Sequence, residues 1–142
     1  MVMNVNDLLG QEWTTLQNNF EQYERSALLI KGASLVIGFA GLVLALDAFL
    51  MAVVVLVCWL QEGITRTFQA RLGQRILKVE SLIAQGALST STPLPFQLHS
   101  EWLATRRRGV GLLQEYAASA LRPTVAYPHG LFFLGFLILG LW

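Results

Sequence analysis

The stretch SALLIKGASLVIGFAGLVLALDAFLMAVVVLVCWL, residues 26–60, decides the fold of this chain. Only two charged residues, Lys31 and Asp47, interrupt its apolar run. A single helix over these residues would be about 52 Å long, whereas the hydrocarbon core of a bilayer is about 30 Å thick. We therefore expect the stretch to turn back near Asp47 and to form a transmembrane hairpin of two helices, over residues 26–62.

Basic residues on both sides of this stretch favour an even number of spans. They are Arg25 and Lys31 at its start, and Arg66, Arg71, Arg75 and Lys78 after its end. Basic residues near span ends mark the cytoplasmic side of a membrane. Both flanks are thus expected in the cytoplasm. Residues 44–48 contain no Gly, Pro or Asn, so the expected turn lacks the usual turn residues. The alternative to a full crossing is a shallower, re-entrant hairpin.

The composition also indicates a membrane protein. Of the 142 residues, 54% are apolar and 13% are charged, whereas about 25% are charged in typical soluble domains. The first 25 residues are polar and carry acidic side chains, unlike a cleavable signal peptide. We expect a multi-pass protein of the inner (plasma) membrane with a cytoplasmic N-terminus.

Two amphipathic helices should flank the hairpin, over residues 1–25 and 63–87. Their large apolar residues recur at spacings of three and four, which is typical of a helix with one buried face. In the first arm these residues are Leu9, Trp13, Leu16, Phe20 and Tyr23, and in the second Ile64, Phe68, Leu72, Ile76, Val79 and Ile83. We expect the arms to form an antiparallel pair in the cytoplasm.

Folding the two arms about Asp47 predicts which charges should meet. Lys31 should lie near Glu62, and this candidate charge pair would lower the cost of two charges in or near lipid. Snorkelling of Lys31 to the headgroups is the alternative. The other expected neighbours are Glu21 and Glu24 near Arg71, and Glu12 near Lys78.

Small residues continue the apolar stripe of the first arm into the hairpin. Ser34, Gly38, Gly41 and Ala45 form two pairs of small residues spaced by four. In lipid, small residues allow helix backbones to approach closely and to pack by van der Waals contact. We expect these four residues to form a helix-packing seam.

The segments after the second arm are predicted to be a linker over residues 88–97 and a cytoplasmic helix over 98–124. Gly109 and Gly111 are expected to interrupt that helix. Arg106, Arg107 and Arg108 form the densest charge in the chain. They could contact anionic lipid headgroups, grip an acidic protein partner, or form a solvated basic turn. Nucleic acid is a poor partner, because no wider basic and aromatic face surrounds them.

The C-terminal segment, residues 125–142, is the third apolar stretch. As a helix it would be about 27 Å long, enough for a thin bilayer. Tyr127 and Trp142 lie near its ends, where aromatic residues anchor at membrane interfaces. We expect a third transmembrane helix with the C-terminus outside. The alternative is a segment that lies in the interface or packs on a partner.

The sequence therefore predicts an all-α integral membrane protein, and it contains no catalytic motif. His99 and His129 have no carboxylate or cysteine at ligand spacing, so we expect no metal, no cofactor and no enzyme activity. The first hypothesis is an accessory, scaffold or immunity-type subunit that contacts a larger membrane-protein assembly through its helices. The alternative is a self-associating channel or transporter subunit, a homo-oligomer that uses Lys31, Asp47 and Glu62.

Overall fold

The structure, a computed structural model, describes residues 4–85, 95–105 and 109–141. Within these residues every regular element is an α-helix, so the all-α prediction is confirmed. The helices are α1 (Val5–Val43), α2 (Ala48–Gln85), α3 (Leu98–Thr105), α4 (Val110–Ala120) and α5 (Pro123–Gly140). Three of them, α1, α2 and α5, are long and apolar enough to cross a membrane.

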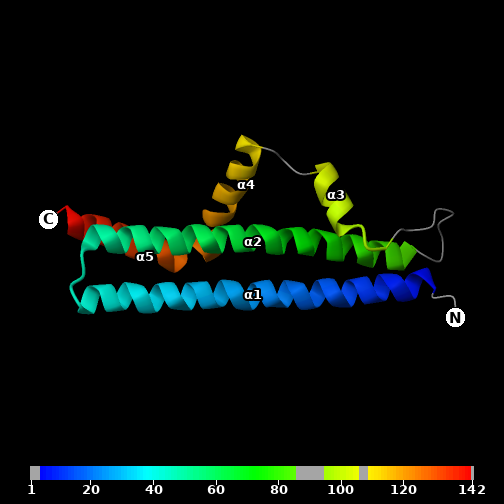
Figure 1. Cartoon of the computed structure of the whole chain (residues 1–142), viewed down its shortest axis with the longest axis horizontal. Coiled ribbons are helices and arrows are strands. Elements are labelled where there is room, and N and C mark those ends of the chain that lie inside the picture. The colour runs from blue at the N-terminus through cyan, green and yellow to red at the C-terminus, as the bar shows by residue number, and fades with distance from the viewer. Residues whose placement is uncertain (1–3, 86–94, 106–108, 142) are drawn as a thin grey trace.

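The long helices α1 and α2 lie antiparallel and side by side (Figure 1). Helix α5 packs on both of them and runs towards the end of the molecule that carries the α1–α2 turn. We call residues 26–62 together with α5 the apolar half, and residues 5–25 and 63–85 together with α3 the polar half. Helices α3 and α4 stand away from α1, on the far side of α2 (Figure 1).

The turn between α1 and α2 uses a local hydrogen-bond motif in place of the usual turn residues. The N–H of Leu46 donates to the carbonyl of Gly41 at 3.0 Å, and the N–H of Ala45 donates to that of Leu42 at 3.4 Å. This is the Schellman pattern, which places the residue after the helix in the left-handed region. Ala45 occupies that position with φ of 49°. Asp47 then caps α2, because its Oδ1 accepts from the N–H of Leu50 at 2.7 Å.

The left-handed conformation of Ala45 leads to a prediction. A Cβ atom costs about 1 to 2 kcal/mol in this region, and glycine avoids that cost. Ala45→Gly is therefore expected to raise the free energy of unfolding. The gain should be no more than about 1 kcal/mol, because the greater entropy of glycine in the unfolded chain offsets part of it. Unfolding by SDS in mixed micelles, followed by circular dichroism, measures the change. A loss of stability would contradict the turn geometry.

In the polar half, an apolar core and a ladder of ion pairs hold α1 against α2. The core consists of Leu9, Leu16, Leu72, Ile76 and Val79. The ion pairs differ from those that folding about Asp47 predicts. Glu12 binds Arg75 rather than Lys78, at 2.8 Å, and Glu24 binds Arg66 rather than Arg71, at 2.7 Å.

Arg71 and Lys78 turn instead towards the helices that follow α2. Arg71 contacts Glu115 of α4 at 3.3 Å, and Lys78 contacts Glu101 of α3 at 2.6 Å. The prediction of these pairs was wrong because the helical period places a side chain on a face of its helix but does not say which helix covers that face.

Residues 98–124 do not form one helix in the structure. Helix α4 begins after Gly109, whose φ of 59° lies in the left-handed region. Helix α4 then approaches α2 closely, because a Cβ built on Gly63 would lie 3.0 Å from the Cβ of Ala120. Next to this contact the hydroxyls of Thr67 and Ser119 form a buried hydrogen bond of 2.8 Å.

Glu101 ties helix α3 to α2, which leads to a prediction on pH. Its Oε1 accepts from Arg75 at 2.8 Å and from Lys78 at 2.6 Å. Burial raises the pKa of the Glu101 carboxyl, but these hydrogen bonds outweigh burial and hold the pKa below its usual range. Because its pKa is lowered, the ionised Glu101 carboxylate stabilises the docked state at pH values above the unfolded-state pKa of about 4.3. That stabilisation is lost as the pH falls through the lowered value.

The distance between spin labels on α2 and α3 tests this prediction. We expect an unchanged distance from neutral pH down to about pH 4.3, and a longer, broader distribution below it. In Glu101→Gln, which cannot ionise, the broad distribution should be present already at neutral pH. Wild-type distances in that variant would show that the carboxylate does not hold α3.

A buried polar cluster as the candidate functional site

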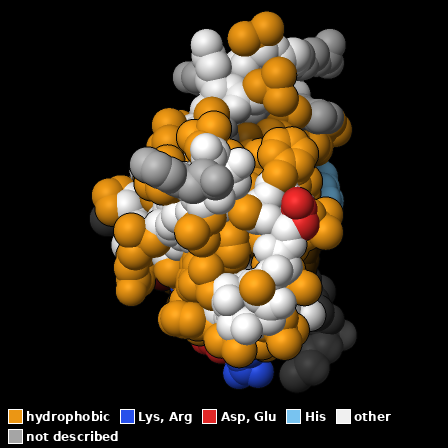
Figure 2. Space-filling view, turned by 90° about the vertical axis from the view of Figure 1, so that its left-hand side faces the viewer, with side chains coloured by type: hydrophobic (Ala, Val, Ile, Leu, Met, Phe, Trp, Pro, Cys, Tyr) orange, Lys and Arg blue, Asp and Glu red, His pale blue; other side chains and the backbone are white. Residues whose placement is uncertain are grey.

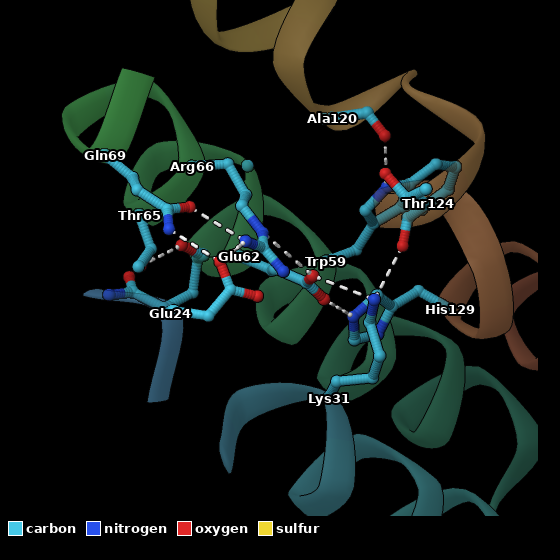
Figure 3. Close-up of polar contacts among 12 residues, drawn as sticks. Glu24, Lys31, Trp59, Glu62, Thr65, Arg66, Gln69, Ala120, Thr124 and His129 are labelled. Carbon is cyan, nitrogen blue, oxygen red and sulfur yellow. Dashed lines mark hydrogen bonds and ion pairs between the residues drawn. The ribbon is translucent and has the colours of Figure 1, made fainter. Parts of the chain in front are cut away.

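Polar side chains from α1, α2 and α5 meet in the apolar half, where hydrophobic neighbours would be expected. Lys31 comes from α1, Glu62 from α2 and His129 from α5 (Figure 3). Ser34, also of α1, joins them through His129. Ser34, Glu62 and His129 are each 0% exposed to solvent. We call these four residues the polar cluster.

His129 lies at the centre of the polar cluster. Its Nδ1 is 2.8 Å from Ser34 Oγ, and its Nε2 is 2.8 Å from Glu62 Oε2. With the proton on Nε2, the ring donates to the carboxylate, and Nδ1 accepts from the serine hydroxyl. Both ring nitrogens are therefore satisfied, as a buried histidine requires.

The other carboxylate oxygen of Glu62 faces two cations. Lys31 Nζ is 3.1 Å from Glu62 Oε1, and Arg66 Nε is 3.8 Å from the same atom. Neither contact meets the geometry of a hydrogen bond to Oε1, so both are electrostatic interactions between opposite charges. Lys31 Nζ donates instead to the backbone carbonyl of Thr124 at 2.6 Å. The structure thus brings together the two residues of the candidate charge pair and ties both to α5.

Hydrogen bonds extend the polar cluster towards the polar half. Arg66 Nη1 donates to Glu24 Oε2 at 2.7 Å and to Gln69 Oε1 at 2.8 Å. Gln69 Nε2 donates in turn to Glu24 Oε2 at 2.6 Å. A continuous series of polar groups therefore runs from Glu24 through Arg66 and Glu62 to His129 (Figure 3).

Local backbone geometry places His129 in this position. Tyr127 has non-helical dihedral angles, with φ of −87° and ψ of 132°, and it kinks α5 just before Pro128. His129 therefore lies in the first turn of the straight part of α5. Trp59 of α2 holds the preceding corner, because its indole N–H donates to the carbonyl of Ala120 at 2.8 Å.

The cluster contains the residue types of a catalytic triad, but its geometry differs from that of a triad. In a Ser-His-acid triad the serine bonds Nε2 and the acid bonds Nδ1. Here the two nitrogens are exchanged, and the side chain of Ser34 is fully buried. What the arrangement can do is hold a proton between Glu62 and His129 and tie α1, α2 and α5 together.

The small residues of the predicted seam receive large side chains. Gly38 faces Phe132 of α5, and a Cβ built on Gly38 would lie 2.7 Å from its ring. Gly41 faces Met51 of α2, and a Cβ built on Gly41 would lie 2.5 Å from the terminal methyl group of Met51. Three seam residues, Ser34, Gly38 and Gly41, are buried. Ala45 is not part of the contact, because it lies in the turn and is exposed.

The remaining predicted residues do not join the polar cluster. Asp47 lies at the start of α2, about 22 Å along that helix from Glu62. Arg106, Arg107 and Arg108 lie outside the described residues. Among the described residues, no group of three or more His, Cys, Asp and Glu side chains could hold a metal ion.

Sequence reasoning missed His129 as a partner of Glu62. The available signal was an ionisable residue inside an apolar segment, which is costly in lipid and needs a partner. The hairpin offers two carboxylates, Asp47 and Glu62, so this signal limits the possible partners of His129 but does not choose between them. Comparisons of the chain with protein-family models, curated proteins and solved structures find no match.

Proposed function

We propose that this protein is a non-catalytic subunit of the inner (plasma) membrane, which acts as an accessory, scaffold or immunity-type component of a larger membrane assembly. In this proposal α1 and α2 cross the bilayer as a hairpin and continue into the cytoplasm as the polar half. Helix α5 enters from the cytoplasmic side and completes a three-helix membrane unit.

The distribution of exposed side chains supports embedding of the apolar half. Hydrophobic side chains cover most of the face at the α1–α2 turn (Figure 2). Large exposed hydrophobic residues lie on all three helices, among them Val36, Phe39 and Val43 of α1, Phe49, Val53 and Val57 of α2, and Leu131, Leu134 and Ile138 of α5. In water such a surface would favour association, whereas lipid tails solvate it.

The length of the apolar half bears on how far it crosses. The straight part of α5, from Pro128 to Gly140, is about 20 Å long, and a hydrocarbon core is about 30 Å thick. The polar cluster therefore sits within the bilayer or at its inner boundary, depending on how deep the turn reaches. A re-entrant hairpin remains the alternative to a full crossing.

Reporter fusions decide between these topologies. Reporters after Asp47, Ser91 and Trp142 are expected to read outside, inside and outside, respectively. An inside reading at Asp47 would favour the re-entrant hairpin. An inside reading at Trp142 alone would show that α5 does not cross.

The observation that carries the subunit proposal is the rigid connection between the two halves. Helices α1 and α2 contain 39 and 38 residues, so each is nearly 60 Å long at about 1.5 Å per residue. The buried Glu12–Arg75 pair fixes their register at the polar end, and the polar cluster fixes it within the apolar half. Such a pair can hold a membrane surface and a cytoplasmic surface at a set distance, which is the task of a scaffold.

Affinity purification from membranes in mild detergent tests the subunit proposal. We expect one stoichiometric membrane-protein partner in the eluate, identified by mass spectrometry. A variant with Phe39 and Leu131 replaced by Ala should keep its helical content. It should retain less of the partner if the exposed hydrophobic surface of the apolar half makes the contact. Recovery of the chain alone, as a defined homo-oligomer, would contradict the proposal.

The polar cluster favours a second candidate function, a self-associating channel or transporter subunit. A fully buried Glu-His pair with two nearby cations can exchange a proton, and intramembrane ionisable groups commonly mark ion or proton paths. Lys31 and Glu62 belong to this cluster, whereas Asp47 lies at the turn. Flux in vesicles tests the idea. If wild type and the variants Lys31→Ala and Glu62→Ala all match empty vesicles, the transport function is excluded.

A further inference from the structure

A large cavity lies between α3 and the α1–α2 pair, outside the polar cluster. Its volume is about 950 Å³, which is within the usual range of small-molecule sites. Tyr23, Phe68 and Trp102 contribute aromatic walls, and Gln22 and Gln74 contribute amides. Helix α3 forms the outer wall and is held at a distance from α2 by side-chain contacts of Glu101 and Trp102.

The charge of the cavity favours an anion. Among the described lining residues three are basic, Arg71, Arg75 and Lys78, and one is acidic, Glu101. Arg75 donates through all three of its guanidinium nitrogens to Glu12 and Glu101. Arg71 and Lys78 are less engaged among the described residues, although a guanidinium has five N–H donors and an ammonium has three. Their hydrogen bonds to Glu115 and Glu101 use only some of these donors.

Arg71 is also held in a form suited to a phosphate group. Its guanidinium carbon lies 5.1 Å from the centroid of the Phe68 ring and 5.3 Å from that of Trp102. These cation–π contacts hold the planar guanidinium between two elements. A preorganised arginine binds phosphate oxygens through two parallel hydrogen bonds, with less loss of side-chain entropy.

The position of the cavity along the helices points to a lipid as the source of that phosphate. Its lining includes Ser26, the first residue of the apolar stretch, and continues through Tyr23 into the polar half. If the apolar half is embedded, the cavity opens at the level of the headgroups. A site at this level meets membrane lipid at high local concentration.

We infer that the cavity between α3 and the α1–α2 pair binds the headgroup of an anionic phospholipid, with Arg71 and Lys78 on the phosphate. The inference rests on the proposed embedding of the apolar half. It adds a ligand and a site to the proposed subunit, and it does not depend on a protein partner. Bound lipid would fill the space between α3 and the α1–α2 pair.

Native mass spectrometry of the purified full chain in detergent tests the inference. The probes are dioctanoyl phosphatidylglycerol, dioctanoyl phosphatidylcholine and glycerol phosphate. One phosphatidylglycerol should bind, with an affinity about 25-fold above that for phosphatidylcholine if each cation adds about fivefold. Lys78→Gln should bind it about fivefold more weakly, and Arg71→Gln/Lys78→Gln should bind both lipids alike.

Two control variants make the result specific. Arg25→Gln removes an exposed cation that does not line the cavity, and it should bind like wild type. Replacement of Arg106, Arg107 and Arg108 by Gln tests the rival anionic-lipid site, and it too should leave the binding unchanged. The Lys78 side chain is 51% exposed, so we expect Lys78→Gln to fold. This variant keeps the test informative if the variant that also replaces Arg71 fails to fold.

Three outcomes would overturn the inference. They are equal binding of both lipids by wild type, unchanged phosphatidylglycerol binding in the double variant, and loss of binding in the triple variant alone. Glycerol phosphate could also displace phosphatidylglycerol when both are present at the same concentration. That result would overturn the inference that the bound phosphate belongs to a lipid and would indicate a soluble phosphate ligand. The assay uses the isolated chain in detergent, so its failure leaves the partner proposal standing, and failure to find a partner leaves the lipid site standing.

Discussion

Replacing Glu62 with leucine is expected to lower the free energy of unfolding by about 3 kcal/mol. Removing one member of a buried ion pair costs about 3 to 5 kcal/mol, because the remaining charge is left without its partner. The low end applies because Lys31 is 21% exposed and keeps its hydrogen bond to the carbonyl of Thr124. His129 also loses its partner at Nε2 while fully buried.

Unfolding by SDS in mixed micelles measures this change, and two further variants locate its cause. Lys31→Leu/Glu62→Leu removes both members of the pair, so its loss should be smaller than the sum of the two single losses. Glu21→Gln on the exposed surface of α1 should change stability by less than about 0.5 kcal/mol. Wild-type stability of Glu62→Leu would show that the polar cluster does not hold the three helices together.

Replacing Gly38 with alanine is expected to cost about 1 to 3 kcal/mol, although alanine is the better helix former. The added Cβ would lie 2.7 to 2.9 Å from three atoms of the Phe132 ring. These atoms belong to the body of a rigid ring, so α5 must shift to make room. Gly32→Ala is the matched control on the same helix, because a Cβ there meets nothing within 4 Å.

The control should gain about 1 kcal/mol from helix propensity, so the two alanine variants should change stability in opposite directions. Gly41→Ala should cost less than Gly38→Ala, because it meets the flexible end of Met51. In Gly38→Ala/Phe132→Leu the smaller side chain should recover part of the loss. Equal stability of Gly32→Ala and Gly38→Ala would contradict the packing of α5 on α1.

The close contact of α2 with α4 illustrates what a sequence pattern leaves open. Gly63 and Thr67 are small residues spaced by four, as are Ser34 and Gly38. The first pair meets the backbone and small side chains of α4, whereas the second meets a histidine and a phenylalanine of α5. Spacing identifies a face that can accept a neighbour, but the neighbour's own side chains determine how close it comes.

The sequence alone determined the properties that depend on local periodicity and length. Residues 26–60 are too long for one span and change direction at residues 44–47, so the hairpin follows from helix rise and from the position of Asp47. The register of the pair near Lys31 and Glu62 follows from the same rise, because both arms are counted from one turn.

Only the tertiary structure decided which segments from the rest of the chain cover that hairpin. His129 reaches Ser34 and Glu62 across separations of 95 and 67 residues, and Arg71 binds Glu115 of α4 rather than a glutamate of α1. These contacts depend on how α4 and α5 dock after the breaks in the helical chain that follow α2. The helical period carries no information about docking across such breaks, because it repeats within one helix and ends where that helix ends.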